Sequence, residues 1–241
     1  MKAKLQTDKE QSMVQRNLFA SVGTMLTAYI VFILSVYFIG RLAKNAEIVS
    51  WGLLGYGALM SILAIIPHYF GKRNRAFYVV SFIMNIIGAG SAASALIKET
   101  LPALHELIGY CVPSFVFLFV IGAIMFIFTC FSEDARAYAS VGAMILGIVF
   151  AVVLLVMWIK NGGFLWSFGF FTSVITAFLT VAMALSLDGN EFLAMKHTSM
   201  GSFGGFLIVF IVVLFVLSEG EILDSLDIDL PSGKKNKAVK K

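Results

Sequence analysis

Residues 145–158 read ILGIVFAVVLLVMW, a run in which the only polar group is the indole N–H of Trp158. The run belongs to a longer charge-free window, residues 137–159. A helix rises 1.5 Å per residue, so about 20 residues cross the roughly 30 Å hydrocarbon layer of a bilayer. The window lacks the alternation of polar and apolar residues that a membrane β-barrel strand needs. It therefore predicts a membrane-spanning α-helix.

Six further charge-free windows of more than twenty residues lie along the chain. They are residues 17–40, 48–71, 76–97, 107–132, 161–187 and 198–218. Of the 241 residues, 59% are apolar and 13% are charged, whereas a soluble domain is about half apolar and about a quarter charged. We predict an all-α, polytopic transmembrane bundle of about seven helices with no soluble domain.

The windows divide the chain into three parts: an N-terminal segment, residues 1–16; a transmembrane domain, residues 17–218; and a polar C-terminal tail, residues 219–241. Without the tail, nine Lys and Arg residues lie on the same side of the membrane as the N-terminus, and four lie on the other side. This bias predicts that the N-terminus is cytoplasmic. The five tail lysines level the count if there are seven spans. Six full spans, with window 76–97 or window 198–218 re-entrant, would return the tail to the cytoplasm, so both counts stay open.

None of the 32 Lys, Arg, Asp and Glu residues falls inside a window. Charges within the membrane usually mark ion and proton pathways, so the pattern counts against a pump, a voltage sensor or a proton-coupled antiporter. The last window also has no lysine for a retinal Schiff base. No nucleotide-binding glycine loop, zinc spacing or nucleic-acid module is present. We expect no cofactor, no metal ion and no nucleic-acid partner, and we assign no catalytic residue.

Two groups of polar or small residues inside the windows stand out. Ser81, Asn85 and Gly88 share one face of the window 76–97 at helical spacing. The second group, Thr172, Thr176 and Thr180, forms a hydroxyl stripe in the window 161–187. Either group is explained by tight helix packing, with threonines bonding back to their own helix. Alternatively, Asn85 and the stripe face each other across an uncharged cavity.

The three histidines, His68, His105 and His197, are scattered along the chain. With seven spans, His68 and His197 share the cytoplasmic face with Asp188 and other acidic residues, where solvated helix ends are the plainer explanation. An enzyme would require that these three residues meet.

We expect a non-enzymatic, permease-like protein for a neutral or apolar small solute. The main alternative is a structural or assembly subunit of a larger membrane complex, and a membrane-embedded enzyme is the third possibility. Beyond the lipid bilayer, expected partners are other proteins or a second copy, held through small-residue helix seams.

Overall fold

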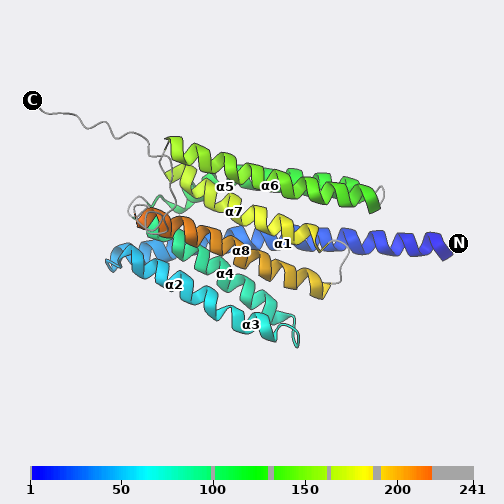
Figure 1. Cartoon of the computed structure of the whole chain (residues 1–241), viewed down its shortest axis with the longest axis horizontal. Coiled ribbons are helices and arrows are strands. Elements are labelled where there is room, and N and C mark those ends of the chain that lie inside the picture. The colour runs from blue at the N-terminus through cyan, green and yellow to red at the C-terminus, as the bar shows by residue number, and fades with distance from the viewer. Residues whose placement is uncertain (1, 99–100, 130–132, 162–163, 187–190, 219–241) are drawn as a thin grey trace, which may run out of the picture.

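The computed structural model describes residues 2–98, 101–129, 133–161, 164–186 and 191–218, and within these ranges every regular element is an α-helix. The helices lie side by side in one bundle (Figure 1). They are α1 (Lys2–Asn45), α2 (Ser50–Leu63), α3 (Ile65–Phe70), α4 (Ala76–Ile97), α5 (Leu104–Thr129), α6 (Glu133–Asn161), α7 (Phe164–Ala184) and α8 (Glu191–Leu217). The prediction of an all-α bundle is confirmed.

Six helical stretches in the described residues are long and apolar enough to cross a bilayer. They are Ser12–Asn45, Ser50–Phe70, Ala76–Ile97, Val141–Asn161, Trp166–Met183 and Phe192–Leu217. The remaining predicted window, residues 107–132, coincides with the 26-residue helix α5, which is not among these six. The architecture is compatible with a multi-pass membrane protein, and a count of seven spans stays a prediction.

Helix α1 is much longer than a single span. Its 44 residues correspond to about 66 Å at 1.5 Å per residue. Its N-terminal part continues beyond the other helices (Figure 1), so the predicted N-terminal segment is helical from Lys2 onward. The predicted tail, residues 219–241, lies outside the described residues.

The second span consists of two helices separated at Ala64. Pro67 has no backbone N–H, so it cannot bond to the carbonyl of Leu63, and its ring would crowd that carbonyl. Hydrogen bonds from Ala64 N to Met60 O (3.0 Å) and from His68 N to Ala64 O (3.2 Å) hold the two helices together. The backbone at Ala64 stays in the right-handed helical region (φ −64°, ψ −19°), and this residue lies beside the cavity described below.

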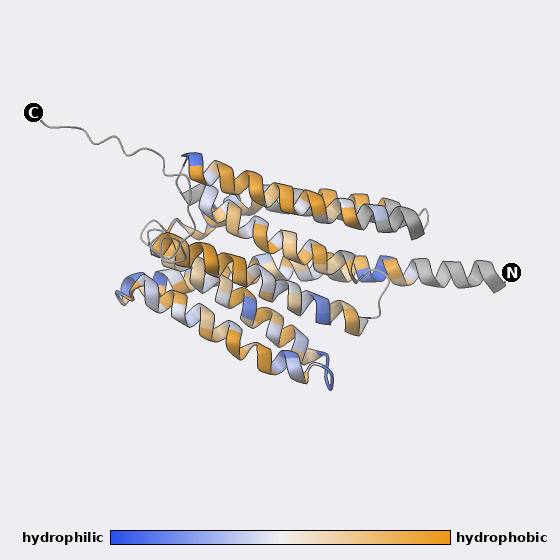
Figure 2. Ribbon diagram, viewed as in Figure 1, coloured by the Kyte–Doolittle hydropathy of each residue, from blue (hydrophilic) through white to orange (hydrophobic). Residues whose placement is uncertain are grey.

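The outer surface of the bundle is apolar, unlike that of a soluble protein. Isoleucine, leucine, valine and phenylalanine are exposed along α1, α2, α6 and α8. The described interior is mainly apolar as well, but it also holds serines, threonines and two asparagines, Asn17 and Asn85. Figure 2 shows apolar residues along most of the visible length of α6. An apolar surface over an interior that contains some polar side chains is typical of a helix bundle in lipid.

Helices α4 and α7 are the two central helices. In α4, 72% of the most apolar window is buried, and in α7 78% is buried, against 18% in α6. Helix α4 packs against α1, α2, α3 and α8, while α7 packs against α5, α6 and α8. The expectation that residues 76–97 form a tightly packed central helix agrees with this burial.

Candidate functional site

Helices α4 and α8 are joined by two pairs of polar side chains in matching register. Ser199 Oγ donates a hydrogen bond to Ser81 Oγ (2.9 Å), and Asn85 Nδ2 donates to Ser202 Oγ (3.3 Å). All four side chains are at most 2% exposed. Ser202 donates its only hydroxyl proton to the carbonyl of Ser199 (2.7 Å), so its oxygen must accept from Asn85. This requirement fixes the orientation of the amide, with its NH2 group toward α8.

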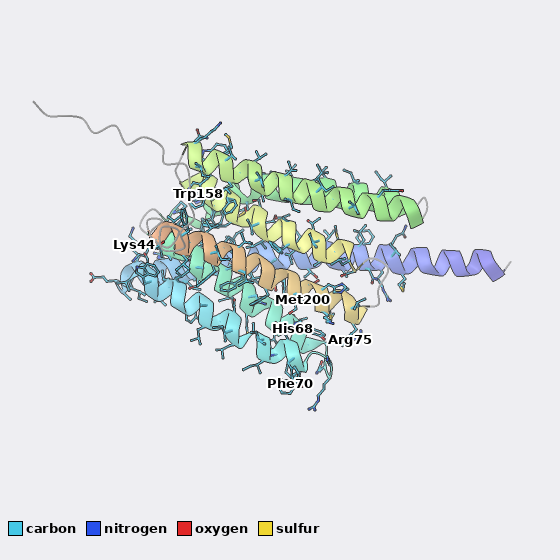
Figure 3. All side chains as sticks on the ribbon, in the orientation of Figure 1. Lys44, His68, Phe70, Arg75, Trp158 and Met200 are labelled. Atoms are coloured by element: carbon cyan, nitrogen blue, oxygen red, sulfur yellow. The ribbon has the colours of Figure 1, made fainter. Side chains whose placement is uncertain are left out.

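A cavity of about 230 Å³ lies beside these pairs, between the α2–α3 break, α4 and α8. Figure 3 labels His68 on α3 and Met200 on α8, which lie at the same end of the bundle. The lining of this cavity contains no Lys, Arg, Asp or Glu. The lining residues are Ser61, Ala64, Ile65, His68, Ser81, Asn85, Ser199, Met200 and Phe203.

Two residues that line this cavity each have a side-chain oxygen that makes no hydrogen bond with the described part of the chain. These oxygens are Asn85 Oδ1 and Ser61 Oγ, both buried. Leaving a buried donor or acceptor without a partner costs about 1–3 kcal/mol. The cavity is also large enough for several waters or a small solute. A molecule that donates to Asn85 Oδ1 and bonds to Ser61 would therefore gain both interactions.

His68 belongs to the same network. Its Nδ1 lies 2.9 Å from Ser199 Oγ, and its ring meets the edge of Tyr78 at a centroid distance of 5.2 Å. The imidazole Nδ1 donates to Ser199 Oγ in one tautomer and accepts from it in the other.

The contact between Ser199 and His68 has the atoms of a nucleophile and its base. In that chemistry the serine hydroxyl donates to the imidazole, and the tautomer of His68 decides whether it does so here. Ser199 Oγ also lies 2.9 Å from Ser81 Oγ, so the contact is part of a polar network beside the cavity.

Gly88, one turn beyond Asn85, is a packing position. A Cβ atom at Gly88 would lie 2.6 Å from Ser61 Oγ and 2.8 Å from the carbonyl oxygen of Gly57. Only a residue without a side chain allows α2 and α4 to approach this closely. Gly88 thus brings Ser61 next to α4 and helps to form one wall of the cavity.

The threonine stripe lies elsewhere, on α7, and none of its residues lines the cavity of Asn85. The hydroxyls of Thr176 and Thr180 donate to the carbonyls of Thr172 and Thr176, at 2.7 and 2.8 Å, and Thr172 donates to Gly169 O (2.9 Å). Tyr29 of α1 contacts Thr176 Oγ1 through its hydroxyl. The structure thus brings Ser81, Asn85 and Gly88 together and places Thr172, Thr176 and Thr180 in a separate helix interface.

Two small residues of the predicted helix seams, Gly201 and Gly147, lie at helix contacts within the chain. Gly201 would place a Cβ 2.9 Å from the carbonyl oxygen of Phe178, and Gly147 would place one 3.3 Å from the Cα of Ala177. Helices α8 and α6 therefore both pack closely on α7.

An enzyme would require that His68, His197 and Asp188 meet, and the structure shows no hydrogen bond between the two described members, His68 and His197. His68 contacts Ser199, while His197 Nδ1 lies 3.4 Å from Ser186 Oγ. Asp188 lies outside the described residues. Among the described residues, no group of three or more His, Cys, Asp or Glu side chains is placed to hold a metal ion.

Sequence reasoning missed Ser61, Ser199 and Ser202 as members of the site, and it took His68 for a solvated helix end. Ser199 and Ser202 are three residues apart, as are residues on one helix face. That spacing was a usable signal for one polar face on α8, although it does not say that α4 is its partner.

Comparison with known proteins gives no guide to function, since no family model, curated protein or solved structure matches the chain.

Proposed function

We propose that this chain is a multi-pass membrane protein, with its N-terminus in the cytoplasm, that binds and passes a small neutral solute through the cavity of Asn85. The observation that carries the proposal is that two residues lining one cavity, Asn85 and Ser61, each hold a buried side-chain oxygen with no hydrogen-bond partner in the described part of the chain. Folding tolerates unsatisfied polar groups mainly where they serve another purpose. Here that purpose is to bond a solute.

The lining supports a solute that is uncharged and able to donate a hydrogen bond. A charged solute would need a counter-charge in a low-dielectric interior. The cavity lining contains no Lys, Arg, Asp or Glu that could supply it. Asn85 Oδ1 can only accept a hydrogen bond, while Ser61 can donate or accept. Short alcohols and amides fit this requirement.

The surroundings of the cavity support an access route between α3 and α8. Ile65 and Met200 line the cavity and are each 54% exposed on the outer surface. Both side chains are apolar, and the methionine is unbranched and repacks easily. A solute that partitions partly into the membrane would enter between them.

Flux through reconstituted liposomes tests the proposal. The purified protein is placed in liposomes, and swelling in glycerol or urea is followed by stopped-flow light scattering. Wild-type vesicles should swell faster than protein-free vesicles. Asn85→Leu should reduce this rate to the protein-free background, because leucine fills part of the cavity and removes its acceptor.

Ser91→Ala is the matched control. Ser91 is a buried residue of the same helix whose hydroxyl donates to the carbonyl of Leu53 (2.9 Å), and it does not line the cavity. Flux in this variant should stay within about twofold of wild type, provided that both variants elute as monodisperse protein. Wild-type flux in Asn85→Leu, or wild-type vesicles that admit neither solute, would count against the proposal.

The alternative, an assembly subunit of a larger complex, is favoured by α6, whose most apolar window is only 18% buried. Lipid covers such a face as readily as a partner does. Purification in mild detergent separates the two functions: stoichiometric co-purification of other membrane proteins would favour a subunit, and a lone species with solute flux would favour the permease.

A further inference from the structure

A second, larger cavity of about 470 Å³ lies between α1, α4 and α8 and shares no lining residue with the cavity of Asn85. Its volume is within the range of small-molecule sites, about 300–1,000 Å³. Its lining residues are Arg16, Asn17, Ala20, Gly23, Thr24, Thr27, Tyr78, Val79, Phe82, Ala194, Met195 and Thr198. We call it the α1 groove.

Helix α1 forms an apolar wall of this groove despite its threonines. Thr24 Oγ1 donates to the carbonyl of Ala20 (2.8 Å), and Thr27 Oγ1 donates to the carbonyl of Gly23 (2.9 Å). Their hydroxyls are therefore satisfied within the helix, and their methyl groups are left to meet a ligand. A Cβ atom at Gly23 would have no neighbour within 4 Å, so the groove is open at this point.

Helices α4 and α8 form the deeper part of the groove. Tyr78 and Phe82 are 1% and 4% exposed, and Ala194 and Met195 add apolar surface from α8. Ala20, Gly23 and Thr27, by contrast, are exposed. The groove is thus apolar and opens on the outer surface of the bundle, where a lipid chain would lie.

One end of the groove is cationic. Arg16 is a lining residue, and it lies one turn before Ala20 on the same face of α1. Arg75 likewise lies one turn before Val79 at the start of α4, at the end of the bundle that carries His68 (Figure 3). None of the lining residues is acidic. From Arg16 to Thr27, eleven residues along α1 span about 16 Å.

From this arrangement we infer that the α1 groove binds an anionic phospholipid. One acyl chain lies along Gly23 and Thr27, and the phosphate lies at Arg16, with Arg75 nearby. Basic residues at the end of an apolar groove between membrane helices are suited to this class of ligand. A neutral lipid would not match the charge of Arg16, and a free phosphate ion would not fill the apolar groove. The inference needs the bundle to lie in a bilayer, but it does not depend on solute transport.

Lipid binding can be measured with the purified full chain in a neutral detergent. Native mass spectrometry counts bound phosphatidylglycerol or phosphatidylcholine of equal chain length, and a melting curve records the stabilisation by each lipid. Wild type should bind phosphatidylglycerol at least tenfold more tightly than phosphatidylcholine. Gly23→Leu, which fills the groove, should weaken phosphatidylglycerol binding at least tenfold. Arg16→Gln should abolish the preference between the two lipids.

Gly55→Leu is the matched control, because a Cβ at Gly55 also has no neighbour within 4 Å and this residue is exposed on α2, outside the groove. It should bind phosphatidylglycerol as wild type does. If Gly23→Leu is recovered unfolded, Ala20→Leu makes the same test one turn away. Equal binding of both lipids by wild type, unchanged binding in the groove-filling variant, or equal stabilisation by inorganic phosphate alone would overturn the inference. Since the assay involves no flux, failure of the transport proposal would leave its outcome unaffected.

Discussion

Helices α4 and α7 are both central and both carry buried polar side chains, yet they treat those side chains differently. On α7, Thr176 and Thr180 donate to carbonyls of their own helix, and Tyr29 adds a contact from α1. On α4, Asn85 uses its amide NH2 group toward α8, while its carbonyl oxygen has no partner within the described chain. The threonine hydroxyls of α7 are satisfied by hydrogen bonds within their own helix, whereas the amide of Asn85 on α4 is satisfied only in part.

This difference shows which buried polar residue in a membrane bundle points to a function. A hydroxyl can return to the preceding turn of its own helix at little cost. A primary amide has two donors and an acceptor, which its own helix cannot satisfy together. Burial alone therefore does not separate Asn85 from Thr180, whereas the count of unmet hydrogen bonds does.

Replacement of packing glycines should produce the largest changes in stability on both helices. Gly88→Ala would force a Cβ against the carbonyl of Gly57, and Gly201→Ala would force one against the carbonyl of Phe178. Backbone atoms cannot move aside as a flexible side chain can, so we expect each variant to lose about 1–3 kcal/mol of unfolding free energy. Unfolding in mixed micelles titrated with sodium dodecyl sulfate measures the loss.

Gly55→Ala supplies the control for both variants, since its new Cβ meets no atom within 4 Å. Alanine favours helix over glycine by up to about 1 kcal/mol, so this variant should be as stable as wild type or slightly more stable. A Gly88→Ala protein as stable as the control would show that α2 and α4 do not approach as closely as described here.

Removal of the polar group should have opposite effects on the two helices. Asn85→Leu eliminates an unpartnered acceptor but also the 3.3 Å bond to Ser202. Because the proton of Ser202 stays bonded to the carbonyl of Ser199, we expect a net rise in the unfolding free energy, of no more than about 1 kcal/mol. Thr176→Val removes the hydroxyl that Tyr29 contacts and should lower that free energy, by about 1 kcal/mol. Both variants are measured by the same titration. A loss of stability in Asn85→Leu would mean that Asn85 serves packing, and the contrast with α7 would disappear.

The bundle itself could be predicted from the sequence because each apolar window requires a helix regardless of its neighbours. Residues 17–40, 48–71 and 198–218 lie on α1, on α2 with α3, and on α8. Tight helix packing was one explanation of Ser81, Asn85 and Gly88 in the window 76–97, and α4 is largely buried. Each of these predictions depends on one helix and on the properties of lipid.

The pairing of helices could not be predicted in this way. Asn85 meets Ser202, which is 117 residues later, and nothing in either segment specifies the other. Each polar face needs a polar partner. From the sequence, the threonine stripe of α7 was as suitable a partner for the polar face of α4 as the serines of α8. Pro67 was visible in the sequence, but the space beside Ala64 depends on how α3 and α8 pack around the break.

The smallest expected change concerns Thr180, and it tests the comparison most directly. Thr180 is fully buried, and its hydroxyl donates to the carbonyl of Thr176 (2.8 Å). Valine has nearly the same shape, and the carbonyl of Thr176 remains available to the ordinary helical N–H bond, so Thr180→Val should change stability by no more than about 0.5 kcal/mol. Solute flux should also remain at the wild-type rate, because Thr180 does not line the cavity of Asn85. A large loss of flux in this variant would place the solute path along α7 instead, because a hydroxyl that serves only its own helix has no means of affecting transport.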